Sequence, residues 1–231
     1  FEARVPHHVA LYHACKSGTI IPFLRERLGI KQKEGDEISL CLPEKSSQQP
    51  LKSLASNGAG SSLAPHAPTV DIFIKTCFKD YEWLQWCLKS IEKFCSGFRR
   101  LIVVSDDEPR FMIPSFAKWI IEPQKSPGYL DQQCVKLRAD QYTDSDYILV
   151  VDSDTVFTKP ITPEYFLREG KSVWRHTSFD SARPDQGVWF SVMKKFLGKS
   201  PTEELMREHP ELVPSWALKE IRTFCQYKHD K

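Results

Sequence analysis

Two aspartates one residue apart, Asp152 and Asp154, have the types and spacing to do chemistry. They directly follow the apolar run Tyr147–Val151. Two carboxylates this close disfavour each other's ionisation unless a cation lies between them. Oxygen ligands suit a hard cation such as Mg2+ or Mn2+, which usually shares its coordination shell with substrate phosphates. The spacing therefore predicts a metal–phosphate site.

The same tripeptide, Asp-Ser-Asp, also occurs in ordinary turns, because Asp and Ser side chains bond to their own backbone. The residues before it favour a functional site. The run Tyr147–Val151 has no polar alternation, which indicates a strand buried on both faces, as in a mainly parallel sheet. Ligands of open α/β sheets bind where such strands end.

The elements that would position this pair begin near Thr69. Residues 1–43 carry a weak helical pattern and are expected to form an appendage. Residues 44–68 are rich in Ser, Gly, Ala, Gln and Pro, which is typical of a flexible linker. Residues 69–231 would then form one domain. The short chain after Asp154 indicates that elements for binding an acceptor could be missing from the C-terminus.

Within 69–154, apolar periodicity predicts strand, helix, strand, strand, helix and strand, the order of βαβ units in an α/β protein. The predicted ranges are 70–75, 81–94, 98–105, 117–122, 129–142 and 147–152. Asp80 is expected to cap the first helix. Beyond the acidic pair we expect a short helix (164–168), a strand (172–177) and helices over 188–197, 202–208 and 215–227, with Thr202 as an N-cap.

Charge and composition exclude several classes of function. Thirty-two basic and 30 acidic residues leave a net charge of +2, and no basic stripe or nucleic-acid module is visible, so no nucleic-acid partner is expected. The sequence has no 18-residue apolar run, and so no predicted transmembrane span. Seven cysteines without a CxxC pair indicate buried thiols in a reducing compartment. We therefore favour a cytoplasmic location, although a chain that starts at Phe1 is expected to be a fragment or a processed form.

Three segments carry a resemblance to a known superfamily: Ile72–Thr76 (Ile-Phe-Ile-Lys-Thr), Tyr129–Asp140 (Tyr-Leu-Asp-Gln-Gln-Cys-Val-Lys-Leu-Arg-Ala-Asp) and Asp144–Asp154. With this order of elements they resemble the GT-A nucleotide-sugar glycosyltransferases. Met206–Pro210 (Met-Arg-Glu-His-Pro) adds a likeness to a little-characterised branch. The resemblance covers residues 69–225. It implies a Rossmann-like, mainly parallel sheet flanked by helices.

The resemblance also implies an activity, the metal-dependent transfer of a sugar from a nucleoside-diphosphate donor, such as a UDP-sugar, to a hydroxyl acceptor such as a glycan. Asp154 would bind Mn2+ or Mg2+, and Asp152 would reach the metal or the donor ribose. The side chains expected around the nucleoside are Lys75, Thr76, Ser105 and Asp106. Gln133, Lys136 and Arg138 would lie on the helix that faces the donor, with Lys136 as the phosphate or ribose contact.

A third metal ligand in such enzymes often comes from a later His, for which His209 is the first candidate and His176 the second. If transfer inverts the sugar's configuration, a carboxylate must deprotonate the acceptor. Asp180 is the preferred base, with Asp185 and Glu204 as alternatives. The sequence does not choose between inversion and retention.

Two other functions compete with transfer. Val150–Val156 satisfies the strand-then-DxDx(T/V) motif of haloacid-dehalogenase phosphatases, in which the first Asp is a nucleophile. That motif normally opens its fold, whereas here βαβ-like units precede it. A catalytically silent GT-A-like domain that binds a nucleotide or a protein partner is the alternative outside enzymology.

Overall fold

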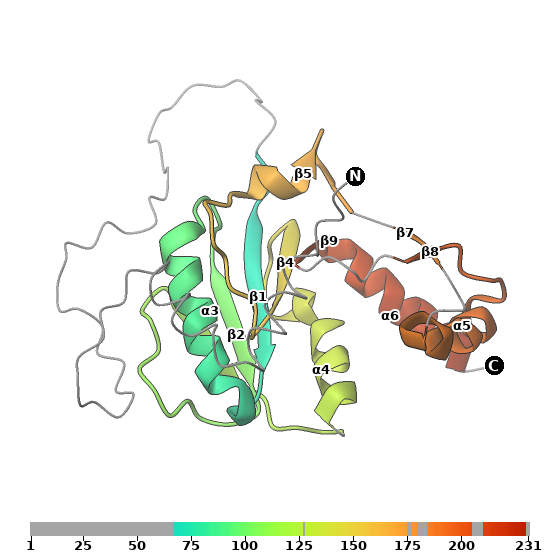
Figure 1. Cartoon of the computed structure of the whole chain (residues 1–231), viewed down its shortest axis with the longest axis horizontal. Coiled ribbons are helices and arrows are strands. Elements are labelled where there is room, and N and C mark those ends of the chain that lie inside the picture. The colour runs from blue at the N-terminus through green and yellow to red at the C-terminus, as the bar shows by residue number, and fades with distance from the viewer. Residues whose placement is uncertain (1–66, 127, 175–176, 180–183, 205–209, 230–231) are drawn as a thin grey trace.

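The computed structural model describes residues 67–126, 128–174, 177–179, 184–204 and 210–229 (Figure 1). The predicted appendage (1–43) and all but the last two residues of the predicted linker (44–68) lie outside these ranges. The strands are β1 (Val70–Thr76), β2 (Leu101–Ser105), β3 (Ala117–Ile121), β4 (Tyr147–Asp152), β5 (Leu167–Arg168), β6 (Lys171–Ser172), β7 (Thr177–Ser178), β8 (Glu203–Glu204) and β9 (Glu211–Pro214). The helices are α3 (Tyr81–Phe94), α4 (Gly128–Lys136), α5 (Pro184–Leu197) and α6 (Ser215–His229), with 3-10 turns η1 (Phe78–Asp80), η2 (Ala139–Gln141) and η3 (Pro163–Phe166).

Five strands form the central sheet in the order β3-β2-β1-β4-β9. The first four are parallel, and β9 pairs antiparallel with β4 at one edge. The chain builds outward from β1 to β2 and β3, and then returns to place β4 on the other side of β1. This arrangement confirms the predicted Rossmann-like, mainly parallel α/β fold.

Helices cover both faces of the sheet, with α3 on one side and α4 and α6 on the other (Figure 1). Alternate side chains of each strand enter opposite cores because successive residues of a strand point to opposite faces. Ile72 and Ile74 pack in the cluster that contains Leu84, Leu88 and Ile91 of α3. In the other cluster, Phe73, Ile148 and Val150 lie with Val135 of α4 and Leu218 of α6.

The strand that precedes the acidic pair is buried on both faces, as predicted. Exposed fractions are 0% for Ile148, Leu149 and Val151 and 8% for Val150. Helix α3 also has the predicted bounds, and α6 begins at the predicted residue. The predicted helix over 129–142 is shorter, since α4 ends at Lys136 and a separate 3-10 turn, η2, follows it.

The expectations after Asp154 needed more correction. The predicted helix over 164–168 is instead the turn η3 followed by β5. The predicted strand over 172–177 is wrong as one element, because β6 ends at Ser172 and pairs with β5, and Thr177 starts β7. The predicted helix over 202–208 is wrong at its start, where Glu203 and Glu204 form β8 against β7, so Thr202 is not its N-cap. Strand β9 was not predicted.

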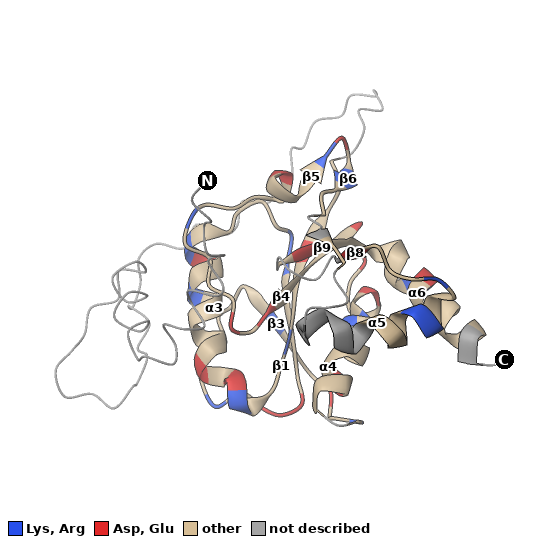
Figure 2. Cartoon of the chain, turned by 45° about the vertical axis from the view of Figure 1, so that its right-hand side comes forward, with Lys and Arg blue, Asp and Glu red and all other residues tan. Residues whose placement is uncertain are grey.

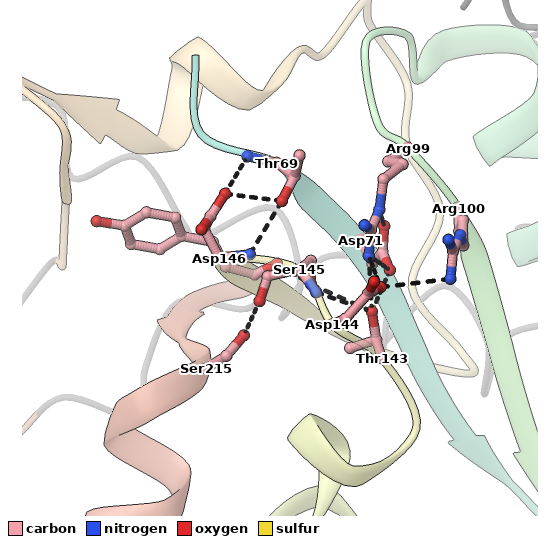
Figure 3. A network of polar contacts seen from close by, with 10 residues as sticks. Thr69, Asp71, Arg99, Arg100, Thr143, Asp144, Ser145, Asp146 and Ser215 are labelled. Atoms are coloured by element: carbon pink, nitrogen blue, oxygen red, sulfur yellow. Dashed lines mark hydrogen bonds and ion pairs between the residues drawn. The ribbon is translucent and has the colours of Figure 1, made fainter. Parts of the chain in front are cut away.

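Polar side chains hold together the end of the sheet where β1, β2 and β4 begin (Figure 3). Buried Asp71 accepts two hydrogen bonds from Arg99, from Nε at 2.9 Å and from Nη2 at 2.8 Å. Arg99 also bonds to Asp144 at 2.7 Å. The Asp146 carboxylate accepts from the backbone N–H and the hydroxyl of Thr69, at 2.7 and 2.8 Å. These contacts join segments 28 to 77 residues apart along the chain.

The cysteines of the described ranges are not joined by disulfides. Five cysteines in the described ranges are free thiols, namely Cys77, Cys87, Cys95, Cys134 and Cys225. Burial raises the pKa of Cys95 to about 12, and the pKa of buried Cys87 is raised well above its ordinary value by the same cause.

Among the helices of the described chain, none combines the length and the apolar character needed to cross a membrane.

Candidate functional site

The acidic pair lies at the carboxyl ends of β1 and β4, where the strand order reverses direction. In this order β1 has β2 on one side and β4 on the other. Connections that leave a parallel sheet in opposite directions at such a point open a crevice, and ligands of α/β proteins bind there. Asp152 is directly beside Lys75 in the register of β1 and β4. In Figure 2, acidic and basic segments colour the lower end of the sheet, where these strands end and α3 begins.

Asp152 forms an ion pair with Lys136, the last residue of α4. The two side chains are 28% and 13% exposed, so the pair is half-buried under α4. The Asp152 backbone carbonyl accepts a hydrogen bond from the N–H of Thr155 at 3.0 Å, and one from the buried Cys87 thiol at 3.8 Å. These backbone contacts fix the turn after β4, and the carboxylate pairs with the Lys136 ammonium group.

Asp154 carries a negative charge that its surroundings do not match. The residue as a whole is exposed, while its carboxyl group is partly desolvated. Burial of that group, followed by the charge of Asp152 and then that of Asp80, raises the pKa of Asp154, and the charge of Lys136 only partly opposes them. A cation beside the pair would remove this repulsion.

The donor set fits a hard divalent cation that shares its shell with a substrate. Asp152 and Asp154 offer carboxylate oxygens only, and the Lys136 ammonium already lies against one of them in the place of a cation. Within the described ranges no group of three metal-binding side chains comes together. Two carboxylates completed by phosphate and water is the usual shell of Mg2+ in proteins.

Lys75 and Asp106 lie at the ends of the neighbouring strands β1 and β2. The buried Lys75 ammonium donates to the Thr76 carbonyl at 2.9 Å and lies 3.6 Å from Asp106 Oδ1 and 4.0 Å from Asp131 Oδ2. Asp106 Oδ1 is buried and has no hydrogen-bond partner. A buried acceptor without a donor is costly, and the Lys75 ammonium 3.6 Å away compensates its charge.

The structure corrects the role predicted for Ser105. Its side chain is 0% exposed, and its hydroxyl donates to the Asp107 carbonyl at 2.5 Å and accepts from Trp119 Nε1 at 2.9 Å. Ser105 therefore supports the strand end from inside the fold. Thr76 is 3% exposed and donates to the Cys77 carbonyl at 3.4 Å, so it too faces inward.

Asp80 belongs to this site, although the sequence predicted it as the cap of α3. It makes no side-chain capping hydrogen bond, and its Oδ2 instead accepts from the Cys77 thiol at 3.5 Å. Its charge also reaches Asp154. Its place four residues after the end of β1 was the signal that could have identified it, because that loop must pass the crevice.

Two other predicted donor contacts lie on or just after α4. Gln133 is half-buried on the helix. Arg138, beyond the helix end, bonds to the Glu122 carboxylate at 2.9 Å, and Glu122 follows β3, two strands away from β1. Of the predicted cations of this segment, Lys136 is the one that reaches the acidic pair.

The remaining candidates are placed only in part. Asp180, His176 and His209 lie outside the described residues, so their predicted roles as base and metal ligands stay predictions. Asp185 lies in the first turn of α5, and Glu204 is in β8 opposite Thr177.

Fold and site together define a Rossmann-like α/β protein with several carboxylates near the carboxyl ends of its parallel strands, at the topological switch point. Residues 88–224 match the model of a family described as "Family of unknown function (DUF6492)". The match covers 137 of the 231 residues, and the chain belongs to this family. No curated protein matches the sequence. The chemistry must therefore be argued from the site, because many functions share this fold.

Proposed function

We propose that this protein is a glycosyltransferase of GT-A type that uses Mn2+ or Mg2+ to transfer a sugar from a nucleoside-diphosphate donor, preferably a UDP-sugar, to a hydroxyl acceptor. One observation carries the proposal. Asp152 and Asp154 end the buried strand β4 beside β1, at the switch point of the sheet, and Lys136 contacts the first of them.

The charges of the crevice support a ligand that is anionic and is bound together with a cation. The carboxylates near this end of the sheet are those of Asp80, Asp106, Asp131, Asp152 and Asp154. A diphosphate alone would be repelled by them, whereas a diphosphate that brings a divalent cation would be attracted. When bound, the cation supplies charge neutralisation of the leaving diphosphate.

The chain's own residues would then position the donor. Asp152 and Asp154 hold the cation, and Lys136 pairs with the diphosphate. Asp106, whose side chain is 15% exposed after β2, accepts a hydrogen bond from the nucleoside through its carboxylate. Through its two ion pairs, buried Lys75 holds Asp106, which follows β2, and Asp131, in the first turn of α4. The proposal also includes an acceptor glycan. Asp180 would act as the base that deprotonates the acceptor's hydroxyl group.

Calorimetric titration of UDP tests the proposal directly. We expect UDP to bind with Mn2+ present and not with EDTA, and Asp154→Ala to abolish binding while the far-ultraviolet circular dichroism is retained. Glu108→Gln, which removes an exposed carboxylate from the same edge of the sheet, is the matched control and should bind as the wild type does.

Assays of UDP release from UDP-sugars then separate the enzyme from a silent binding domain. Metal-dependent release with wild type, lost in Asp154→Ala, supports transfer or donor hydrolysis. UDP binding without release from any donor would favour the silent domain. Absence of UDP binding under both conditions would overturn the proposal, and release of phosphate from a phosphomonoester that requires Asp152 would point to the phosphatase.

A further inference from the structure

Lys136 occupies the position at Asp152 that a divalent cation needs. Its ammonium group is in direct contact with Asp152 Oδ1, and its side chain is only 13% exposed. The charge of Lys136 also acts on Asp154. Lys136 is thus the internal counter-ion of the acidic pair in the ligand-free protein.

The two partners of this ion pair differ in how far their charged groups can move. Asp152 is fixed through its backbone by the Thr155 N–H and the Cys87 thiol. Lys136 is the last residue of α4, and a lysine side chain is a compact charge on a flexible four-carbon stem. The carboxylate can therefore stay in place while the ammonium group moves.

We propose that Lys136 is a displaceable counter-ion: it neutralises Asp152 in the free protein, yields that carboxylate to the divalent cation, and then pairs with the donor's diphosphate. This inference rests on the proposed function, because it assumes that the acidic pair binds the cation.

The exchange has a thermodynamic consequence. A cation that binds alone must compete with Lys136 and leaves the ammonium without its partner. A cation that binds together with the diphosphate gives Lys136 a new partner. Lys136 thus makes the two ligands bind more strongly together than separately, and this coupling is reciprocal. The free protein would hold Mn2+ weakly, and the complete donor complex would hold it tightly.

Lys136→Met removes the charge and keeps the length of the side chain, and it tests the inference on the full chain. Mn2+ binding is measured without nucleotide from the electron paramagnetic resonance signal of free Mn2+. We expect the variant to bind Mn2+ about tenfold more tightly than the wild type or better, because the competitor is gone. At saturating Mn2+, we expect its affinity for UDP to fall about tenfold.

Two control variants separate this effect from a general change of charge. Lys125→Met breaks another lysine–carboxylate pair, that with Glu122 at 2.9 Å, and should leave both affinities unchanged. Lys136→Arg keeps the positive charge and should bind Mn2+ within about threefold of the wild type. Circular dichroism and the thermal midpoint establish that each variant is folded.

The outcomes distinguish the inference from the proposed function. If Lys136→Met binds Mn2+ no more tightly than the wild type, Lys136 is not a competitor and the inference is overturned. If it binds Mn2+ more tightly by the same factor with and without UDP, and its UDP affinity at saturating Mn2+ is unchanged, Lys136 does not move to the diphosphate and the inference is again overturned. In both cases wild-type UDP binding that requires Mn2+ leaves the proposed function standing. If neither wild type nor Lys136→Met binds Mn2+, the metal site of the proposed function fails, and the inference fails with it.

Discussion

The two ends of the parallel sheet carry similar residues in different states. At the end where the strands begin, Asp71 and Asp144 meet Arg99, and Asp146 is bonded by Thr69 (Figure 3). At the end where they finish, the acceptor Asp106 Oδ1 has no hydrogen-bond partner, and burial and then the charge of Asp152 oppose the ionisation of Asp154.

This difference separates the charges that stabilise the fold from those that are suited to ligand binding. Arg99 is held by several acceptors in fixed geometry, which is the arrangement that stabilises a structure. The carboxylates at the end where the strands finish repel one another, and two lysines, Lys75 and Lys136, balance their charge. Binding of a cationic ligand would relieve this repulsion, so these charges favour ligand binding more than stability of the free protein. The first end should respond to substitution in its stability, and the second in its binding.

The largest effect is expected at the strand-beginning end. Arg99→Met removes the salt bridge and two of the hydrogen bonds that the fully buried Asp71 carboxylate accepts, and leaves it the one from Thr143. We expect the free energy of unfolding to fall by about 3 kcal/mol or more in urea titrations at pH 7. The double variant Asp71→Leu/Arg99→Met should regain a large part of the loss. A loss below about 1 kcal/mol would show that this network does not hold the sheet together.

The next effect concerns the strand-finishing end and its ligands. Mn2+ and UDP at about 100 times their dissociation constant should stabilise the wild type by about 2.7 kcal/mol, and EDTA should reverse the gain. The two ligands should not stabilise the variant Asp154→Asn. Arg99→Met, measured where it is still folded, should be stabilised as much as the wild type, since Arg99 and Asp154 have no partner in common among the described residues. An equal gain by Asp154→Asn would contradict the site.

Glu122 sharpens the comparison, because it follows β3 at the strand-finishing edge and yet has several partners. Burial alone would raise its pKa, but hydrogen bonds from Tyr142, Lys125 and Arg138 lower it from 4.5 to about 2. A lowered pKa stabilises the folded protein above the unfolded-state value, and the gain is lost as pH falls from 4.5 towards 2.

We therefore expect Glu122→Gln to lower the free energy of unfolding by about 1 kcal/mol at pH 7. The difference in free energy of unfolding between Glu122→Gln and the wild type should become smaller when both are unfolded in urea at a pH near 2, the lower end of the range over which Glu122 is protonated. A gap that does not depend on pH would mean that the Glu122 charge is not what stabilises this corner.

The smallest expected effect is the stability of ligand-free Asp154→Asn. Burial and then the charge of Asp152 oppose the ionisation of Asp154, so losing its charge removes a repulsion. Its free energy of unfolding at pH 7 should stay within about 0.5 kcal/mol of wild type or rise slightly. A clear fall would place Asp154 among the residues that hold the fold together.

Much of the fold could be predicted because its signals are local. The apolar periodicity of Tyr81–Phe94 and the continuous apolar run before Asp152 each lie within one element, and both elements have the predicted extent. The elements after Asp154 were predicted poorly. Glu203 and Glu204 follow a sequence pattern typical of a helix start but pair with β7, and Glu211–Pro214 becomes a strand only through its pairing with β4.

The site divides in the same way. The sequence by itself determined that Asp152 and Asp154 lie at a strand end and that Lys136 lies in the helix before them. The apolar patterns of the strand and the helix, and the spacing of the two aspartates, are each contained in a short run of consecutive residues. Only the tertiary structure decided that Lys136 contacts Asp152, that Asp80 acts on Asp154, and that the Ser105 hydroxyl is enclosed by Trp119. Each of these contacts joins residues 14 or more positions apart, and such contacts depend on how the strands are ordered in the sheet, which local patterns do not specify.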